Sequence, residues 1–207
     1  MTTMQDFSQQ GLLVKPDSVP EIRIQLDPIH DPGLVVLGGG CFWCIDLLFR
    51  QLRGVQSVIS GYSGGDANKA HYRDVTTGQS GHIEVVQVDY DPELISFNEI
   101  LRVFFLVAHN PTQKDGQGPD IGPHYRSVIF CTNTQQMLAA QTFIRELDSL
   151  HVFGDPIVTR VETLKSFYPA EQYHQDYANK HPHQPYVRQV AEPKLQKLER
   201  YFDSLLD

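Results

Sequence analysis

Cysteine is scarce in this sequence, with three residues, Cys41, Cys44 and Cys131, in a chain of 207. Three cysteines cannot form the disulfide framework of a small secreted domain, and a chain of this length can bury a core without one. So few cysteines are typical of a reducing compartment, and we expect a cytoplasmic protein. Because Cys41 and Cys44 stand close together, they indicate local chemistry rather than a scaffold.

Long apolar runs and blocks of like charge are also missing. No run reaches the roughly 18 residues of a membrane-spanning helix. Met1 to Gln10 lack the basic and apolar regions of an export signal. The net charge is -8, with 25 acidic residues against 17 basic ones. Since an acidic balance argues against nucleic acid or an anionic membrane as a partner, we expect the protein to bind neither.

The patterning of the chain predicts three stretches. Residues 1–32 carry several prolines and little periodicity, and we expect an N-terminal extension there. Residues 33–190 alternate short apolar runs with helical spacing and form the expected main domain, while 191–207 form a helical tail packed on the same domain. Within the main domain we expect, among other elements, a strand over 125–131 and a helix over 171–180. Alternating strands and helices, interrupted by long loops at 66–80 and 110–123, favour a two-layer α/β sandwich with a mixed sheet.

The run Gly38-Gly39-Gly40-Cys41 follows a short apolar strand and precedes helical spacing from Phe42 to Leu52. Glycines allow a sharp turn and a close backbone approach, so we expect Cys41 at the start of a helix. Free N–H groups and the helix dipole favour an anion there, and the thiolate is the nucleophilic form of cysteine. The dipole alone supplies about 0.3–1 kcal/mol, so further activation has to come from neighbours or substrate.

Cys44 follows Cys41 by three residues and lies on the same face of the expected helix. This spacing suits redox or nucleophilic thiol chemistry. A structural zinc site would need two more ligands, and no second Cys-x-x-Cys exists. A second alternative is that both cysteines are inert core residues, but this would not explain why a triple glycine precedes Cys41. A thioredoxin-like disulfide oxidoreductase is an alternative, although the large rings of Phe42 and Trp43 look more like a substrate pocket than a protein-docking groove.

A series of short motifs runs along the chain from Gly40 onward. The motifs are Gly40-Cys41-Phe42-Trp43, Gly61-Tyr62-Ser63-Gly64-Gly65, Tyr72-Arg73-Asp74-Val75, Gly81-His82-Ile83-Glu84-Val85, Tyr90-Asp91-Pro92, His109-Asn110-Pro111-Thr112, Asp120-Ile121-Gly122, Tyr125-Arg126-Ser127, Phe167-Tyr168-Pro169-Ala170-Glu171 and Tyr173-His174-Gln175, with Gly78 and Tyr177. Over about residues 34–190 the sequence resembles the A-type peptide methionine sulfoxide reductases. One motif would be weak evidence, but an ordered series is specific.

The resemblance implies reduction of the S epimer of methionine sulfoxide, free or in proteins, by a catalytic reductase domain at 33–190. It implies an α+β fold: a mixed sheet with helices packed on it, and a ferredoxin-like core with long loops and a C-terminal extension. The implied site residues are Cys41 as the nucleophile that attacks sulfur, Phe42 and Trp43 as the apolar wall around the substrate methyl, Glu84, Tyr72 and Tyr125 as the groups that hold the sulfoxide oxygen, and Asp120, His174 and Tyr177 as the surrounding polar network.

Glu84 also suits this role on chemical grounds. A sulfoxide oxygen leaves poorly unless it is protonated, so an acid has to lie beside it. Glu84 stands between Ile83 and Val85 in an apolar strand, where an unpaired carboxylate is costly and the pKa of a carboxyl is raised. Strand alternation equally permits an outward-facing Glu84. Tyrosine hydroxyls donate hydrogen bonds without charge, and Tyr72 and Tyr125 lie at or next to the long loops.

The sulfenic acid formed on Cys41 would condense readily with a nearby thiol. Many family members keep a resolving cysteine just after a Gln-Pro-Tyr segment, but here Gln184-Pro185-Tyr186 is followed by Val187, and no cysteine follows Cys131. We expect Cys44 to be the substitute, with the disulfide reduced by thioredoxin or an equivalent dithiol protein. Helical Cβ atoms three residues apart lie about 5–6 Å apart, beyond the ~3.5–4.5 Å of a disulfide, so the first turn should distort. We expect Cys131 to be a small buried side chain.

The nine histidines are scattered along the chain. His181-Pro182-His183 looks most like a metal motif, but it lacks further ligands and fits an exposed loop, so we expect neither a metal nor another cofactor. A module that recognises oxidised methionine without turnover is a second alternative, which the loss of Glu84 or a pocket tyrosine would have favoured. We expect a monomer, because the motifs account for the domain without a second interacting face.

Overall fold

One mixed sheet forms the centre of the computed structural model, which describes residues 14–24, 26 and 31–207. The strand order is β7-β6-β1-β3-β2-β8. All neighbouring strands are antiparallel except β6 and β7, which are parallel, so the prediction of a mixed sheet is confirmed. The strands are β1 (Leu34–Gly38), β2 (Val55–Ser63), β3 (Ile83–Tyr90), β6 (Val128–Cys131), β7 (Arg160–Thr163) and β8 (Tyr168–Pro169).

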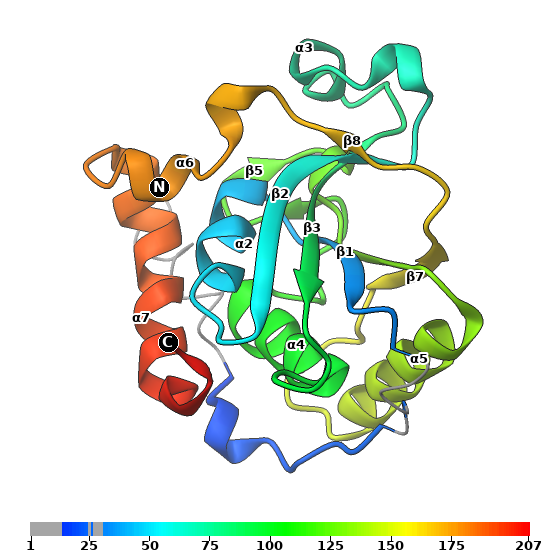
Figure 1. Cartoon of the computed structure of the whole chain (residues 1–207), viewed down its shortest axis with the longest axis vertical. Coiled ribbons are helices and arrows are strands. Elements are labelled where there is room, and N and C mark those ends of the chain that lie inside the picture. The colour runs from blue at the N-terminus through cyan, green and yellow to red at the C-terminus, as the bar shows by residue number, and fades with distance from the viewer. Residues whose placement is uncertain (1–13, 25, 27–30) are drawn as a thin grey trace.

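Helices surround this sheet (Figure 1). The α-helices are α2 (Phe42–Phe49), α3 (Tyr72–Val75), α4 (Phe97–Val103), α5 (Thr134–Ser149), α6 (Tyr177–Lys180) and α7 (Glu192–Tyr201). Two π-helical turns, η4 (Phe104–Ala108) and η7 (Val187–Ala191), continue α4 and precede α7. The short 3-10 helices are η1 (Pro16–Ser18), η3 (Ala67–Lys69), η5 (Pro123–Tyr125), η6 (Gln172–His174) and η8 (Asp203–Leu205), and a separate hairpin pairs β4 (Gly116–Gln117) with β5 (Asp120–Ile121). Across the described ranges, no helix combines the length and the apolar character needed to cross a bilayer.

The central elements follow the order β1-α2-β2-β3-α4-β6, with β6-β1-β3-β2 side by side in the sheet. This is the ferredoxin-like arrangement that the sequence predicts within an α+β fold. Strand alternation sorts the side chains: Val86 and Val88 pack with α2 and α4 in the main core, while Ile83 and Val85 pack with Val128 and others in a second cluster.

The predicted helix over 171–180 is wrong in detail. The chain instead forms η6 and α6, which are separated at Gln175 and Asp176. The side chain of Gln175 accepts a hydrogen bond from the Ser60 N–H and donates to the Ser60 carbonyl, each at 2.9 Å, so it pairs with the backbone of β2. Asp176 adopts a left-handed conformation with φ 56°. A side chain that pairs with a sheet edge competes with continuation of the helix.

Parts of the terminal stretches pack on the core. In the first 32 residues, Val14, Val19 and Ile22 are buried in the main cluster. At the other end, α7 lies beside α2, and Leu52 bridges to Leu206. The Arg53 N–H donates to the Leu205 carbonyl at 2.8 Å. The division at 32/33 and 190/191 remains a prediction, and the expected lack of an export signal concerns residues 1–10, which lie outside the described ranges.

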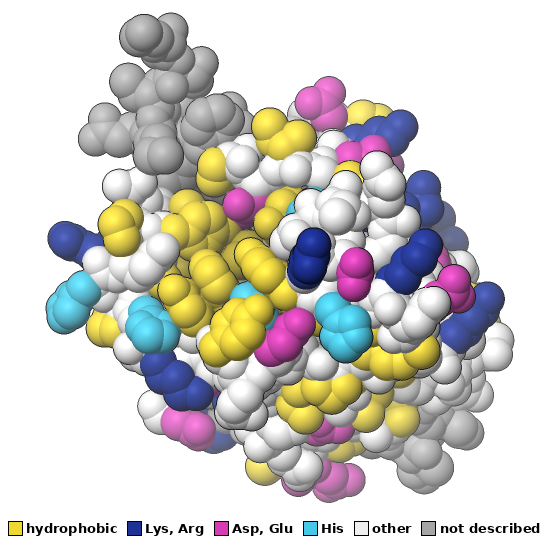
Figure 2. Space-filling model, turned by 90° about the horizontal axis from the view of Figure 1, so that it is seen from above, with side chains coloured by type: hydrophobic (Ala, Val, Ile, Leu, Met, Phe, Trp, Pro, Cys, Tyr) yellow, Lys and Arg dark blue, Asp and Glu magenta, His cyan; other side chains and the backbone are white. Residues whose placement is uncertain are grey.

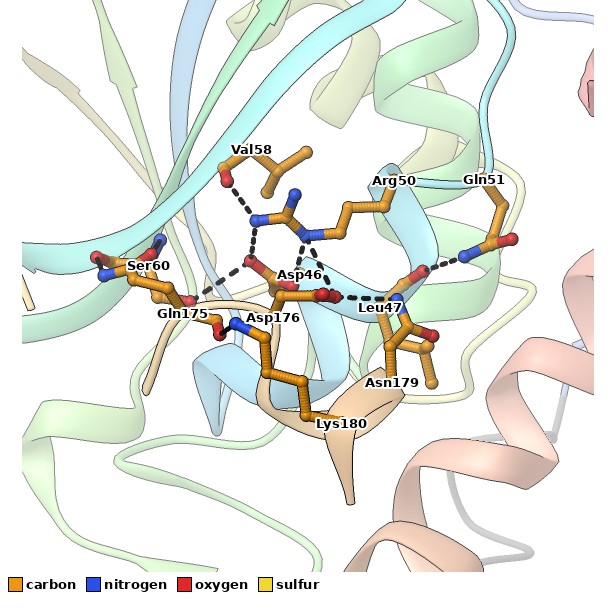
Figure 3. Close-up of polar contacts among 10 residues, drawn as sticks. All are labelled: Asp46, Leu47, Arg50, Gln51, Val58, Ser60, Gln175, Asp176, Asn179 and Lys180. Atoms are coloured by element: carbon orange, nitrogen blue, oxygen red, sulfur yellow. Dashed lines mark hydrogen bonds and ion pairs between the residues drawn. The ribbon is translucent and has the colours of Figure 1, made fainter. Parts of the chain in front are cut away.

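A buried ion pair ties α2 to the rest of the fold (Figure 3). The Arg50 guanidinium donates to both oxygens of Asp46, at 2.7 and 3.0 Å, and also to the Val58 carbonyl of β2. Its Nε lies 3.6 Å from Oδ1 of Asp176, beside α6. The Asp46 side chain is only 2% exposed, whereas that of Arg50 is 28% exposed. The pair therefore joins α2, β2 and the segment before α6 at one point.

Replacing Arg50 by Met should lower the free energy of unfolding by about 3 kcal/mol, because Asp46 would stay buried without its cation. Urea unfolding followed by circular dichroism measures the loss. The matched control is Arg145→Met: Arg145 and Glu146 are 3.9 Å apart and 68% and 56% exposed. That change should stay within about 0.5 kcal/mol. Equal effects of the two variants would contradict a structural role for the buried pair.

Candidate active site

Cys41 follows the triple glycine and lies at the start of α2, as the sequence predicts. Gly40 has φ 93°, and its N–H donates to the Tyr125 carbonyl at 3.1 Å. A Cβ atom on Gly40 would lie 2.8 Å from Cβ of Gln117, and one on Gly39 would lie 2.9 Å from the His109 ring, so side chains do not fit in this turn. Cys41 is then the N-cap residue of α2.

Glu84 lies directly beside this helix start. Its Oε2 accepts a hydrogen bond from the Phe42 N–H at 3.2 Å. On β3, Glu84 alternates with Ile83 and Val85 and shares the face of Val86, so it points toward α2 and is not outward-facing. The residue is 1% exposed. Burial raises the pKa of its carboxyl to about 8, so the group is largely protonated at neutral pH and can give up a proton.

The two thiols of the cysteine motif interact with each other. Cys41 is 9% exposed and Cys44 is 1% exposed. Burial raises the pKa of Cys41 well above its usual value, and its hydrogen bond to Cys44 adds to this. The pKa of Cys44 is lowered, first by the hydrogen bond from Cys41 and also by the charge of Lys194. Desolvation of Cys41 thus outweighs the favourable effect of the helix start on its thiolate, and further activation has to come from neighbours or substrate.

Aromatic rings pack around the two residues that follow Cys41. The Trp43 indole stacks on Tyr177 of α6, with ring centroids 3.8 Å apart at 12°. Its Nε1–H donates to Nδ1 of His174 at 3.2 Å. The rings of Phe42 and His174 lie 5.0 Å apart. The predicted wall residues therefore lie together, with a polar edge on His174.

His174 is a neutral histidine with one free position. Burial lowers its pKa, and its Nδ1 accepts from Trp43, so the proton belongs on Nε2. Nε2 is buried and has no hydrogen-bond partner among the described residues. The Tyr72 ring lies 4.5 Å away. This corner of the site holds an unused donor.

Tyr72 and Tyr125 come from separate short helices. Tyr72 begins α3, and Tyr125 ends η5 rather than beginning a strand as the sequence predicts. Burial raises the pKa of both hydroxyls, and charge on Glu84 and on Cys41 raises them further. Both hydroxyls therefore keep their protons and can donate hydrogen bonds near these two groups.

Asp120, on the β4–β5 hairpin, is joined to Cys44 through Tyr186. The Tyr186 hydroxyl donates to Oδ2 of Asp120 at 2.5 Å. The Cys44 Sγ donates to the same hydroxyl at 3.9 Å. Burial raises the pKa of Asp120, although the Tyr186 hydrogen bond opposes this. Tyr186 was not among the predicted site residues, and its place after Gln184-Pro185 was the only signal in the sequence.

Glu171 was missed as well. Its Oε1 accepts from the Tyr72 N–H and its Oε2 from the Tyr62 hydroxyl, both at 2.9 Å. It thereby fixes the start of α3, which carries Tyr72, against β2. A family motif contains Glu171, but nothing in its spacing indicates these partners.

Other predicted features lie apart from this group. Cys131, at the end of β6, is fully buried in the main core, and burial raises its pKa to about 12. His181 and His183 are exposed, as expected for a loop. All three cysteines are free thiols.

Figure 2 views the face that carries α3, α6 and β8, where hydrophobic side chains gather with acidic and histidine side chains among them. The chain neighbours of two site residues, Tyr173 and Ile121, are 60% and 84% exposed. The site thus combines a nucleophilic sulfur, a protonated carboxyl, neutral donors and an apolar wall. Such a set can protonate a polar oxygen and take it from the sulfur-like centre that carries it, which is thereby reduced.

Comparisons with known proteins agree on one family. The peptide methionine sulfoxide reductase MsrA of Trichodesmium erythraeum is 48% identical over 168 residues, 81% of this chain and 94% of that protein. The crystal structure of reduced Mxr1 from Saccharomyces cerevisiae matches with a TM-score of 0.71 and 31% identity, over 83% of this chain and 98% of that one. The structure of Mxr1 in complex with Trx2 matches with a TM-score of 0.50 and 27% identity, over 75% and 90%. A family model described as peptide methionine sulfoxide reductase matches residues 34–205, and the chain belongs to this family.

Proposed function

We propose that this enzyme reduces the S epimer of methionine sulfoxide, free or in proteins, to methionine. The observation that carries the proposal is the Glu84 carboxyl, which is buried, largely protonated and hydrogen-bonded to the residue after Cys41. A neutral acid beside a sulfur nucleophile is what sulfoxide chemistry requires. A disulfide oxidoreductase of the thioredoxin type has no need of it, and family membership does not favour that alternative.

In the first step the sulfoxide oxygen lies among Glu84, Tyr72 and Tyr125, and the substrate methyl lies against Phe42 and Trp43. Asp120, His174 and Tyr177 form the surrounding network. The sulfur of Cys41 attacks the sulfoxide sulfur while Glu84 protonates the oxygen. The oxygen is transferred to give a sulfenic acid on Cys41, and the sulfoxide is reduced to a thioether. The substrate gains the two electrons that the Cys41 sulfur loses.

Cys44 supports the first step by accepting a proton. Because Cys41 donates a hydrogen bond to Cys44, and the pKa of Cys44 is lowered, the thiolate form of Cys44 is populated near neutral pH, and the Cys41 proton can pass to this form as attack proceeds. The nucleophile is then ionised only when it reacts. A protonated Glu84 adds no repelling charge to the attacking sulfur.

In the second step Cys44 attacks the Cys41 sulfenic acid, forming a disulfide and releasing water. The Cys44 N–H donates to the Cys41 carbonyl at 3.2 Å, so both cysteines share the first turn, which has to distort for the sulfurs to bond. A thioredoxin-type dithiol then reduces the disulfide. The yeast relative Mxr1 has been crystallised in complex with Trx2, which supports a partner of this kind. We further propose a cytoplasmic monomer without metal or other cofactor.

The cysteine assignments predict a thiol count. Reduced wild-type protein mixed with methionine S-sulfoxide, without external reductant, should lose two thiols per methionine formed. Cys41→Ser should form no methionine, and Cys44→Ser should lose one thiol and carry a sulfenic acid that dimedone labels. Thiol titration and mass spectrometry measure both outcomes.

Cys131→Ser is the matched control, because it removes a thiol that lies in the core. It should still lose two thiols per methionine. If Cys44→Ser recycles with thioredoxin at the wild-type rate, Cys44 is not the resolving thiol.

The raised pKa of Glu84 predicts a loss of oxygen transfer as pH rises through about 8, because the carboxyl then gives up its proton. Glu84→Gln should slow single-turnover methionine formation by roughly 10²- to 10⁴-fold and abolish this alkaline limb. The control is Glu162→Gln, because the Glu162 side chain on β7 is 44% exposed. It should leave both the rate and its pH profile unchanged.

Glu84→Gln should slow the reaction without lowering the stability of the fold. An unfolded Glu84 ionises above its ordinary pKa near 4.5, whereas the folded one stays protonated until about 8. Between these values the unfolded state binds fewer protons, so rising pH destabilises the wild type at this group. Glu84→Gln should therefore melt no lower than the wild type at pH 8 in calorimetry. A variant that is both slow and clearly less stable would indicate that Glu84 acts mainly in folding.

A further inference from the structure

Tyr186 connects two groups that no other described side chain joins. It precedes η7 and reaches across to the β4–β5 hairpin, where its hydroxyl donates to Asp120. The same oxygen accepts from the Cys44 thiol at 3.9 Å. One hydroxyl thus stands between a thiol and a carboxylate, with each partner at hydrogen-bond distance.

Cys44 needs such a contact because it is closed off from solvent. It is 1% exposed and packs with Leu47, Ala178, Val187 and Ala191 in a separate apolar cluster. A thiol attacks a sulfenic acid as the thiolate, so its proton has to leave during resolution. After the first step Cys44 holds the proton it has taken from Cys41, and water has no direct path to it.

We propose that Tyr186 relays the Cys44 proton to Asp120 while Cys44 attacks the Cys41 sulfenic acid. This inference rests on the proposed function, in which Cys44 resolves. Tyr186 is then a catalytic residue for the second step, since its oxygen touches the reacting sulfur, and Asp120 is the final proton acceptor.

The step balances in atoms and charge. The S–S bond forms as the S–O bond of Cys41 breaks. The Cys44 proton passes to the Tyr186 oxygen as the Tyr186 proton passes to Asp120. Glu84 is ionised by the first step and takes up a proton from solvent when methionine leaves. Hydroxide then departs with this proton from the Glu84 carboxyl, as water. Asp120 ends neutral and Glu84 ends charged, and solvent exchange returns the proton from Asp120 to Glu84.

The charged and titratable groups that face Cys44 agree with this direction of transfer. They are Cys41, Glu84, Asp120, Tyr186 and Lys194. Lys194, on α7, favours the thiolate. Asp120 is the one group hydrogen-bonded to Tyr186 that can accept a proton, and burial makes it more basic than an ordinary aspartate.

Packing alone does not require the hydroxyl. The Tyr186 ring meets Trp43 edge-on at 6.0 Å and lies against the apolar cluster around Cys44. Phenylalanine keeps both contacts, so Tyr186→Phe removes the relay and leaves the ring in place.

The test separates the two steps in single turnover. Tyr186→Phe should form methionine at the wild-type rate but form the disulfide on the order of 100-fold more slowly. The Cys41 sulfenic acid should accumulate and react with dimedone. Slow disulfide formation should recover as pH rises, because a larger share of Cys44 is then already ionised before the attack and needs no relay. Tyr201→Phe, which removes a hydroxyl from α7, should match the wild type in both steps.

A second variant tests the acceptor. Asp120→Asn should slow resolution, and the double variant should be no slower in this step than the worse single one, since both changes break the same relay. Disulfide formation at the wild-type rate in Tyr186→Phe overturns the proposal. So does equal slowing of both steps without a change in the pH profile, which indicates positioning only.

The same experiments distinguish failure of the relay from failure of the proposed function, in which Cys44 is the resolving thiol. If Cys44→Ser still loses two thiols per methionine, the resolving assignment is wrong and the relay falls with it. If Cys44→Ser accumulates sulfenic acid and Tyr186→Phe does not, the proposed function stands and the relay alone is overturned.

Discussion

The site depends on one costly feature, a carboxyl group buried at the start of the helix that carries the reactive sulfur. The fold places Glu84 on the helix-facing side of β3 and lets one backbone N–H of α2 reach it. Desolvation keeps the proton on this group at neutral pH. The neighbouring tyrosines keep their protons for the same reason, so the oxygen site consists of neutral donors.

Much of this arrangement could be predicted from local patterns. Three features are visible within a few residues of sequence: the triple glycine, the apolar spacing after Cys41, and a single acid in an apolar strand. The pKa of Cys41 could not be read this way, because the dipole is a local effect while burial comes from distant elements. The contacts of Tyr186 with Asp120 and of Glu171 with Tyr62 and Tyr72 join positions 66, 109 and 99 apart. Such pairs leave no periodic signal.

The segment from Glu171 to Lys180 shows why the helix predicted there was wrong in detail. The side-chain amide of Gln175 pairs with the β2 backbone at Ser60, and Asp176 adopts a left-handed conformation beside Arg50. These contacts hold His174 and Tyr177 against Trp43. Local helix propensity yields here to tertiary hydrogen bonds.

The pairing of residues 204–206 with the end of α2 has a consequence for biosynthesis. Arg53 donates to the Leu205 and Ser204 carbonyls, the latter 151 positions away, and Leu52 bridges to Leu206. During synthesis, Cys41 and Cys44 leave the ribosome well before Tyr186 and residues 204–206 are translated. The thiol environment of the reductase is therefore complete only after residues 186–206 have left the ribosome.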